Sequence, residues 1–388
     1  MEPIHKCDVL VIGAGIMGCA LAYDLAREGI DVVLLDRGMV CGGSSGLNAG
    51  GVRHQFTNEL NARLATRSIE RIVQFQQEWG LDFGFHAVGY LFLVATEQHD
   101  GAFRETVALQ NQWGVPSRYL SPDEIAALVP GIYTDDLRGG AFCPTDGYLD
   151  PHSLVSGFAD AARRAGTVVT QNAQVVGLET GSHGVTGVVT ARHGRYSPDV
   201  VVNAAGVWAP AIAQLYGGTL PIIPWRSQLF AITHVPDLGE RLPMTIDFDH
   251  GKAYFHRDGA GIIAGMDNET SSALTWDVPC DWKKFPSIAE RLTYRVPALE
   301  EAEVTHGWAG FLELTPDENP IVGWTDLDNV YTAAGFSGHG LSIAPGLAPE
   351  VAREIQRLPT TLPLDDYRRD RFAAGVSADG EAEALSMR

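Results

Sequence analysis

A chain of 388 residues is longer than a single hydrophobic core usually serves, so the sequence predicts two domains. The formal net charge of −20 argues against nucleic-acid binding, which needs a cationic surface. The five cysteines are odd in number, widely spaced and without a CxxC motif, which argues against a disulfide framework and a zinc site.

The apolar segments of the chain are short. None approaches the ~18 consecutive apolar residues that a transmembrane helix requires. The first predicted strand begins near residue 7, which leaves no room for a signal peptide. We therefore expect no membrane span and a cytoplasmic location. The small, acidic segment 373–388 is predicted to be a mobile tail.

The first informative stretch, residues 9–36, is VLVIGAGIMGCALAYDLAREGIDVVLLD. An apolar run without alternation predicts a buried parallel strand at 9–12, and an amphipathic pattern predicts a helix at 16–28. A second apolar run predicts a strand at 31–36. Such a β-α-β unit is the frame in which a glycine-rich turn binds a dinucleotide.

Three glycines, Gly13, Gly15 and Gly18, form a GxGxxG motif in the turn of this unit. They permit a sharp turn, a close approach of the backbone to a pyrophosphate, and close packing of helix on strand. The helix N-terminus attracts the phosphates. Asp36 ends the second strand, where its carboxylate can accept a hydrogen bond from a ribose hydroxyl. The alternative, an ordinary glycine-rich turn, leaves Asp36 unexplained.

A second glycine-rich segment, residues 41–56, is CGGSSGLNAGGVRHQF. It is too poor in apolar residues to form much of a core, and its backbone N–H groups are available to a ligand. A nicotinamide-binding domain does not need such a loop, whereas a flavin dinucleotide would use it; the alternative is a flexible surface loop. The expected contacts are Ser44 and Ser45 with the pyrophosphate, and Asn48, Gly50 and Gly51 with the flavin ring.

Three later segments complete the expected cofactor site. Residues 167–179 predict two strands joined by a turn, with the backbone of Val175 facing an adenine. Residues 199–213 predict a buried strand that runs into small residues, for which helix–strand packing is the alternative explanation. Residues 330–355 predict a strand, a glycine-rich turn and a helix whose N-terminus would stabilise a reduced, anionic flavin. The remaining candidate cofactor contacts are Arg37, Ala205, Gly206, Trp208, Gly310, Gly335, Gly338, His339, Gly340, Leu341 and Ser342.

Together these motifs resemble the D-amino-acid oxidase/sarcosine oxidase superfamily of FAD-dependent oxidoreductases, and most of all its sarcosine oxidase β-subunit-like and proline dehydrogenase-like members. The resemblance runs from residue 9 to about residue 355. It is carried by VIGAGIMG…LLD, GSSGLNAGGVR, VVNAAGVWA, YFHRDGAGIIAG, LTPDENPIVG and AAGFSGHGLS. It implies FAD as cofactor and oxidation of an amine or amino acid at a C–N bond, with hydride passing to flavin N5 and hydrolysis of the imine product.

The resemblance also implies an α/β (α+β) fold. A discontinuous Rossmann-like FAD-binding domain would take residues 1–80, 145–220 and 310–370. A substrate domain with a large mixed β-sheet would take residues 81–144 and 221–309, and the flavin would lie between the two.

Several positions depart from the pattern of the relatives. Some relatives attach FAD through a cysteine that would fall near Gly310 or a histidine that would fall near Asn48, so we expect noncovalent FAD. Others attach FMN to a histidine at the position of Pro151, so FMN is not expected. The lysines that monomeric sarcosine oxidases use for oxygen and for the substrate carboxylate match Ile263 and Ser342. Both losses weaken the case for sarcosine as substrate and for oxygen as electron acceptor.

Five residues are candidates for the chemistry. Arg53 follows the second glycine-rich loop, and its planar guanidinium suits a substrate carboxylate; a surface position or an intramolecular ion pair is the alternative. His54 is a second candidate for substrate binding. Tyr254 and His256 share one face of a predicted strand, which we expect to line the cavity; otherwise they are ordinary sheet residues. An amine must be neutral to give up hydride, and His54, His256 and His339 are the candidate proton acceptors.

The leading functional hypothesis is a flavin enzyme that oxidises an amino acid or a secondary amine. A 2-hydroxy-acid dehydrogenase with the same fold and an FAD-binding subunit of a larger complex are the alternatives. The expected partner is a small-molecule substrate, and both a homo-oligomer and a hetero-complex stay open. No metal is expected, because the other histidines lack ligand spacing. A serine hydrolase fails, because the GxSxG pattern would need glycine where His339 stands.

Overall fold

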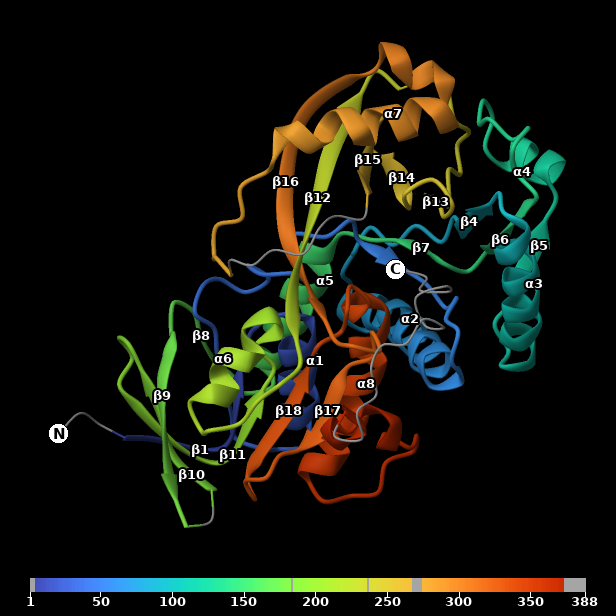
Figure 1. Cartoon of the computed structure of the whole chain (residues 1–388). Helices are drawn as coiled ribbons and strands as arrows, with labels where there is room; N and C mark the ends of the chain where they lie inside the picture. Colours follow the sequence, from blue (N-terminus) through green and yellow to red (C-terminus); the bar gives the residue numbers. More distant parts are fainter. Residues whose placement is uncertain (1–3, 183, 236, 267–273, 373–388) are drawn as a thin grey trace.

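Two large β-sheets organise the chain, which a computed structural model describes over residues 4–182, 184–235, 237–266 and 274–372 (Figure 1). Within these ranges each large sheet has eight strands. A third, two-stranded sheet pairs β3 (Gly51–Val52) with β7 (Gly147–Tyr148).

The first sheet carries the β-α-β unit that the GxGxxG motif predicted. Its main path runs β17-β18-β11-β1-β2-β8, with β10 attached to β11 and β9 to β10. The pairs of β1 with β11, β1 with β2 and β11 with β18 are parallel, so their carboxyl ends meet at one edge. The strands are β1 (Ile4–Ile12), β2 (Val32–Leu35), β8 (Val168–Thr170), β9 (Val175–Gly181), β10 (Gly184–Thr190), β11 (Arg195–Asn203), β17 (Ile321–Trp324) and β18 (Val330–Ala334).

Side chains of β1 alternate between two cores, because successive residues of a strand point to opposite faces of the sheet. Val9 and Val11 join the core that four helices cover, whereas Leu10 and Ile12 join the core formed with β9 and β10. The four covering helices are α1 (Ile16–Arg27), α2 (Glu59–Trp79), α5 (Pro151–Arg164) and α8 (Gly340–Ile355). A shorter helix, α6 (Ala209–Gln214), follows β11 through the 3-10 turn η1 (Gly206–Trp208).

Helix α2 begins and ends at signals that the sequence displays. The side chain of Asn58 accepts a hydrogen bond from the N–H of Asn61 at 2.8 Å, which caps the first turn. Gly80 ends the helix with a left-handed φ of +60°. The helix predicted at 16–28 is confirmed as α1, with Gly29 in the left-handed region (φ +82°) just after it.

The second sheet is mixed and runs β16-β12-β15-β14-β13-β4-β6-β5. Strand β13 pairs in parallel with β4, and its pairing with β14 is antiparallel. One face packs on α7 (Phe285–Arg295), and α3 (Glu97–Gln112) and α4 (Pro122–Leu128) lie beside β5 and β6 (Figure 1). The strands are β4 (Tyr90–Val94), β5 (Arg118–Leu120), β6 (Gly139–Cys143), β12 (Ile223–Thr233), β13 (Met244–Asp247), β14 (Ala253–Asp258), β15 (Gly261–Met266) and β16 (Glu303–Leu314).

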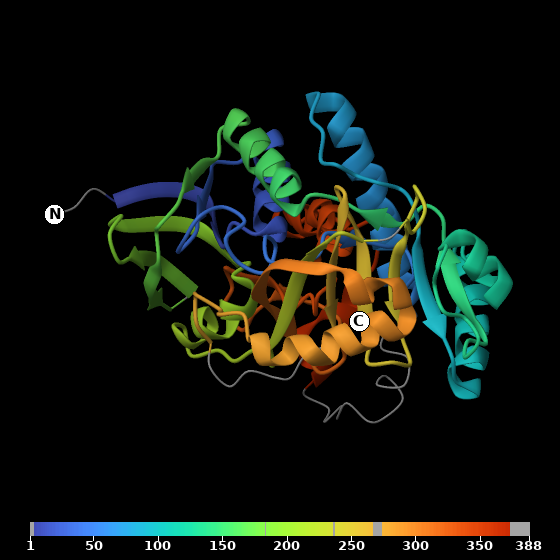
Figure 2. The same ribbon diagram turned by 90° about the horizontal axis from the view of Figure 1, so that it is seen from above.

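The long strands β12 and β16 connect the two sheets. They pair antiparallel from Ile223 with Leu314 to Thr233 with Glu303. In Figure 1 they run from the level of the first sheet up to α7, and β16 leads into β17 of the first sheet. Seen from above, β1 and the teal helices α3 and α4 lie at opposite ends of the molecule (Figure 2). The chain therefore passes from one sheet to the other without an isolated linker.

The expected α/β fold, with a Rossmann-like unit and a large mixed sheet, is confirmed. The division into FAD-binding and substrate domains stays a prediction, and β16 runs across the boundary expected at residue 310. The tail predicted at 373–388 lies outside the described residues. Within the described ranges, no helix combines the length and the hydrophobicity that crossing a bilayer requires.

All five cysteines lie in the described part of the chain, and none of them forms a disulfide. Cys7 and Cys19 are buried in the cores around the first β-α-β unit, and Cys41 and Cys143 are buried as well. Cys280 is half-buried.

Candidate active site

A groove of about 440 Å³ lies at the carboxyl ends of the parallel strands of the first sheet. Segments far apart in the sequence line it, from the end of β1 to the start of α8. Gly18, Gly50, Gly310, Gly335, His339 and Ser342 lie outside its lining. The candidate cofactor contacts that line it are Gly13, Gly15, Asp36, Arg37, Ser44, Ser45, Asn48, Gly51, Val175, Ala205, Gly206, Trp208, Gly338, Gly340 and Leu341.

The GxGxxG turn leaves no space for side chains. A Cβ built at Gly13 would lie 2.3 Å from the carbonyl oxygen of Ala204, and φ at Gly13 is +111°. A Cβ at Gly18 would lie 1.8 Å from the carbonyl oxygen of Gly13. Gly15 faces the groove, and the N–H of Ile16, at the start of α1, donates to Ser45 Oγ at 3.0 Å. The two glycine-rich segments therefore meet at a helix N-terminus, where anions bind well.

Asp36 ties the end of β2 to this turn. Its Oδ2 accepts a hydrogen bond from the N–H of Ala14, and its Oδ1 accepts one from the N–H of Gly38, each at 2.7 Å. Burial raises the pKa of Asp36, and the two backbone donors oppose that rise. The carboxyl group thus shapes the turn, and it also lines the groove where a ribose hydroxyl would need an acceptor.

Asn48 shapes the second glycine-rich loop from within. Its amide nitrogen donates to the carbonyl oxygens of Ser44 (3.1 Å) and Ser45 (2.7 Å), and its amide oxygen accepts from the N–H of Gly50 (2.7 Å). A Cβ built at Gly310 would lie 2.7 Å from Cβ of Leu47 in the same loop. The loop is therefore held against β16, in a fixed shape that keeps Ser44, Ser45 and Gly51 at the groove.

Arg53, His339 and Ser342 come together where this loop meets α8. The Nη2 atom of Arg53 donates to Nε2 of His339 at 3.0 Å, and its backbone N–H donates to Ser342 Oγ at 3.1 Å. The guanidinium lies 4.4 Å from the ring centroid of Phe56 and 5.5 Å from that of Phe92. Burial lowers the pKa of Arg53. Arg53 is thus buried, and the alternative explanation of a surface arginine is wrong.

Tyr254 and His256 have different surroundings. Tyr254 packs against the aromatic cluster of Tyr90 and Phe92, on the face of β14 opposite Phe255. The ring of His256 lies 4.3 Å from that of Tyr148, and its Nδ1 bonds to the carbonyl oxygen of the next residue at 2.8 Å. Burial lowers the pKa of His256 to about 4, so its imidazole is neutral at pH 7. Neither residue lines the groove.

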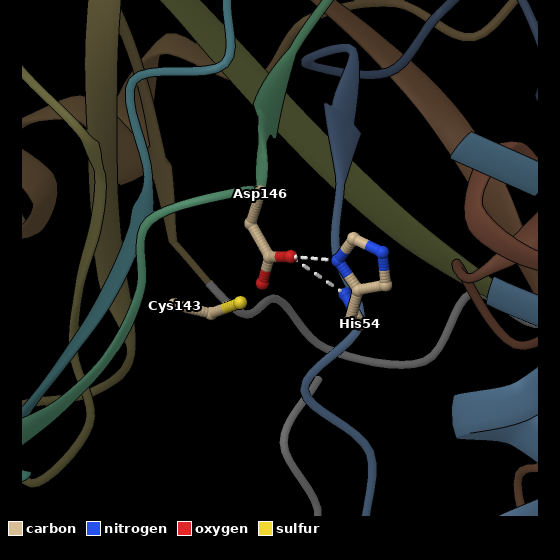
Figure 3. Close-up of side chains that lie close together, drawn as sticks. All are labelled: His54, Cys143 and Asp146. Carbon is tan, nitrogen blue, oxygen red and sulfur yellow. Dashed lines mark hydrogen bonds and ion pairs between the residues drawn. The ribbon is translucent and has the colours of Figure 1, made fainter. Parts of the chain in front are cut away.

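His54 and Asp146 form a buried pair next to Arg53 (Figure 3). Oδ1 of Asp146 bonds to Nδ1 of His54 at 2.5 Å and accepts from its backbone N–H at 2.9 Å, and Oδ2 accepts from the amide of Gln55 at 3.3 Å. The thiol of Cys143 lies beside them, and the three ligand atoms are within 4.8 Å of one another. Burial raises the pKa of Cys143 to about 12, which keeps it a thiol rather than the thiolate that binds metals. The hydrogen bonds of Asp146 to His54 and Gln55 hold residues 53–55 in place. The absence of a metal stays a prediction.

Comparison with known protein families identifies the family of this chain. A family model described as "FAD dependent oxidoreductase" (DAO) matches residues 8–354. The chain is a DAO-family FAD-dependent oxidoreductase. FAD is therefore its cofactor, and the resemblance inferred from the motifs is confirmed.

Three relatives place the chain within the DAO family. Human mitochondrial sarcosine dehydrogenase is 29% identical over 367 residues, which cover 90% of this chain and 39% of that protein. Glycine oxidase of Geobacillus kaustophilus is 24% identical over 383 residues, which cover 97% of this chain and 100% of that protein. The crystal structure of L-proline dehydrogenase from P. horikoshii superposes with a TM-score of 0.90 at 32% identity, covering 96% of this chain and 99% of that one. The chain thus spans about two fifths of the length of the sarcosine dehydrogenase.

The groove fits FAD in its shape and in its donors. The bare backbone at Gly13 and Gly15 leaves a cradle, and the serines, the start of α1 and the start of α8 supply N–H and O–H groups. Residues of β1, α1, α6, β16 and β18 supply the apolar walls that a flavin ring needs.

Glu313 and Trp276 are two of the groove residues that were not predicted from the sequence. Glu313 is buried on β16, its carboxyl group accepts from the N–H groups of Gly335 and Phe336, and burial raises its pKa to about 7. The available signal was one acid within the apolar run WAGFLEL. Trp276 gives no signal of its own, because its place in the lining depends on a loop of the second sheet crossing to the first.

Proposed function

We propose that the protein oxidises the C–N bond of a small amine that carries a carboxylate, such as an N-alkyl amino acid or a cyclic amino acid. The observation that carries this proposal is the buried guanidinium of Arg53, which lies between His339 and the aromatic rings of Phe56 and Phe92. Sarcosine and L-proline, which the names of two relatives contain, are both secondary amines with a carboxylate one carbon away.

Arg53 would bind the substrate carboxylate, because a planar guanidinium matches its two oxygens. The rings of Phe56 and Phe92 keep water from this contact and strengthen it. His54 and Asp146, through Gln55, hold the backbone that carries the arginine. FAD, when bound, supplies the hydride acceptor.

His339 is the proton acceptor that this geometry favours. Its Nε2 accepts a hydrogen bond from Arg53. A substrate carboxylate that draws the guanidinium to itself would release this nitrogen, which can then take the proton of the amine. His256 is less suited, since a pKa of about 4 makes it a weak base at neutral pH.

Anaerobic reduction of the bound flavin tests the function. Sarcosine, L-proline, glycine and lactate are added separately to the yellow protein, and the bleaching of the flavin band is followed. We expect one of the amines to bleach it. Reduction by lactate alone would indicate the alternative 2-hydroxy-acid dehydrogenase. No reduction by any member of a wider panel would favour an FAD-binding subunit of a larger complex.

The substitution Arg53→Ala tests the carboxylate contact. We expect apparent binding of the reducing amino acid to weaken about a hundredfold, because a buried, hydrogen-bonded charge pair loses one partner. Arg53→Lys should recover part of this loss, and Arg104→Ala, at a side chain that is 55% exposed, should change nothing. If every carboxylate-bearing substrate reduces the flavin of Arg53→Ala as readily as that of wild type, Arg53 does not bind the carboxylate.

We also propose how FAD is attached and where in the cell the protein is located. FAD is noncovalent, supported by Gly310 and Asn48 at the positions where some relatives attach it, and acid precipitation should leave all flavin in the supernatant. The location is cytoplasmic, which fractionation of the source cells checks.

A further inference from the structure

Trp276 belongs to the part of the chain that builds the second sheet, but it lies on the glycine-rich loop of the first. It follows β15 and precedes the 3-10 turn η2 (Trp282–Lys284). A Cβ built at Gly38 would lie 2.2 Å from Cζ2 of the indole, and one built at Gly42 would lie 3.3 Å from the same atom. The indole therefore rests on the backbone that follows β2, over glycines that leave room for it.

Arg37 and Trp208 complete a cluster with Trp276, which we call the tryptophan clamp. The ring centroids of the two tryptophans are 5.2 Å apart. Cζ of Arg37 lies 5.2 Å from the centroid of Trp208 and 4.9 Å from that of Trp276, within the range of cation–π attraction. All three residues line the groove, as does Asp36 at the end of β2. The clamp thus lies at the end of the groove where the adenosine and diphosphate are expected.

The segment that carries Trp276 is tied to the second sheet. The guanidinium of Arg226, on β12, donates to the carbonyl oxygen of Pro279. The N–H of Asp281 donates to the side-chain oxygen of Gln228, also on β12. Trp276 therefore reaches the groove from an anchored position. Its contact with the first sheet bridges the two halves of the fold.

A tryptophan that is 38% exposed and lines the groove gains buried surface when a cofactor fills that groove. We propose that the tryptophan clamp retains FAD: the indole of Trp276 closes the adenosine end of the groove, and FAD leaves only after this indole moves off Gly38. The proposal rests on FAD binding, which membership of the DAO family gives, and is independent of the substrate proposed above.

The test is the rate at which FAD leaves the holoenzyme. Free-flavin fluorescence is followed after rapid dilution of wild type, Trp276→Ala, Trp276→Phe and a matched control, Trp282→Ala. Trp282 is 51% exposed and packs on Phe230, away from the groove. We expect release to be about tenfold faster for Trp276→Ala, smaller acceleration for Trp276→Phe, and no change for Trp282→Ala.

Steady-state fluorescence gives a readout that does not depend on kinetics. The chain has eight tryptophans, and those at the groove should be quenched when FAD binds. Trp276→Phe should lose part of this quenching, and Trp282→Ala should retain it.

Two outcomes would overturn the proposal. One is release from Trp276→Ala within twofold of wild type. The other is equal acceleration in Trp276→Ala and Trp282→Ala, which would show general loosening of the segment. If Trp276→Ala does not fold, Trp276→Leu, which keeps an apolar side chain without an aromatic ring, takes its place with the same expected acceleration.

Discussion

Glu313 has a buried carboxyl group at the cofactor groove, and its surroundings raise its pKa. Burial raises this pKa to about 7, although the N–H groups of Gly335 and Phe336 oppose the rise by stabilising the charge. Its Oε2 has no hydrogen-bond partner within the described residues. Because the folded-state pKa lies above the ordinary 4.5, the folded protein keeps a proton that the unfolded chain releases between about pH 4.5 and 7. Stability is therefore lost as the pH rises through this window.

Glu313→Gln should remove this pH dependence, because glutamine has the same shape and does not ionise. The shift from 4.5 to about 7 corresponds to roughly 3 kcal/mol at most. We expect the free energy of unfolding of the apoprotein to fall by up to that amount more in wild type than in Glu313→Gln between pH 5 and pH 8. Urea unfolding at the two pH values measures this difference. An identical fall in both proteins would show that Glu313 ionises normally.

At the scale of one element, the packing of α1 on β1 depends on Gly18. A methyl group there would lie 1.8 Å from the carbonyl oxygen of Gly13, so Gly18→Ala must push the helix away from the turn. We expect a loss of about 3 kcal/mol in the free energy of unfolding, with loss of FAD binding. Gly101 is the control: it lies exposed within α3 with nothing within 4 Å of a built Cβ, so Gly101→Ala should gain about 0.5–1 kcal/mol. Equal effects of the two substitutions would contradict this account.

Elements with local signals are the ones that a sequence can predict. Asn58 and Gly80 mark the ends of α2 through hydrogen bonds and dihedral angles that these residue types favour. The GxGxxG turn is local in part: Gly18 packs on Gly13, and the N–H of Gly13 donates to the carbonyl oxygen of Leu35 at the end of the next strand. The close approach of Gly13 to Ala204 joins residues far apart in the sequence. The lengths of β12 and β16 were not predicted, because their pairing joins residues about eighty positions apart, such as Gln228 and Ala309.

The same reasoning applies to the site. Arg53 and His339 were each singled out from neighbouring glycines, but the hydrogen bond between them was not, because 286 positions separate them. The burial that changes the pKa of Glu313 and His256 depends on packing by distant segments, which a single sequence does not display.

At the scale of the whole molecule, strand β16 of the second sheet reaches the groove of the first sheet. Phe311, Leu312 and Glu313 line the groove, while the other end of the same strand, β16, packs beside the core under α7. That core rests on a buried ion-pair network: Arg295, at the end of α7, bonds to Asp247 at 2.7 Å and to Asp136 at 2.8 Å. Its side chain is 1% exposed. We therefore expect the molecule to unfold as one unit.

Arg295→Ala tests this cooperativity. Removing the arginine leaves the buried carboxylate of Asp247 and the partly buried one of Asp136 without their cation, which should cost about 3–5 kcal/mol. Thermal unfolding of the holoenzyme, followed by circular dichroism and by flavin fluorescence, should shift to lower temperature by the same amount with both signals. A flavin-release midpoint that stays in place while the circular-dichroism midpoint falls would show that the two sheets unfold separately.

The burial of four of the five cysteines leaves Cys280 as the site for a thiol-reactive label. Burial raises the pKa of Cys7, Cys41 and Cys143 to about 12, and that of Cys19 is raised as well, so these thiols react slowly. Burial raises the pKa of Cys280 too, but Cys280 is only half-buried, so a reagent can reach it; it lies four positions beyond Trp276. A maleimide dye or spin label would therefore attach there in preference to the other thiols. It would report on the bridging segment in the unmutated enzyme while the flavin enters and leaves.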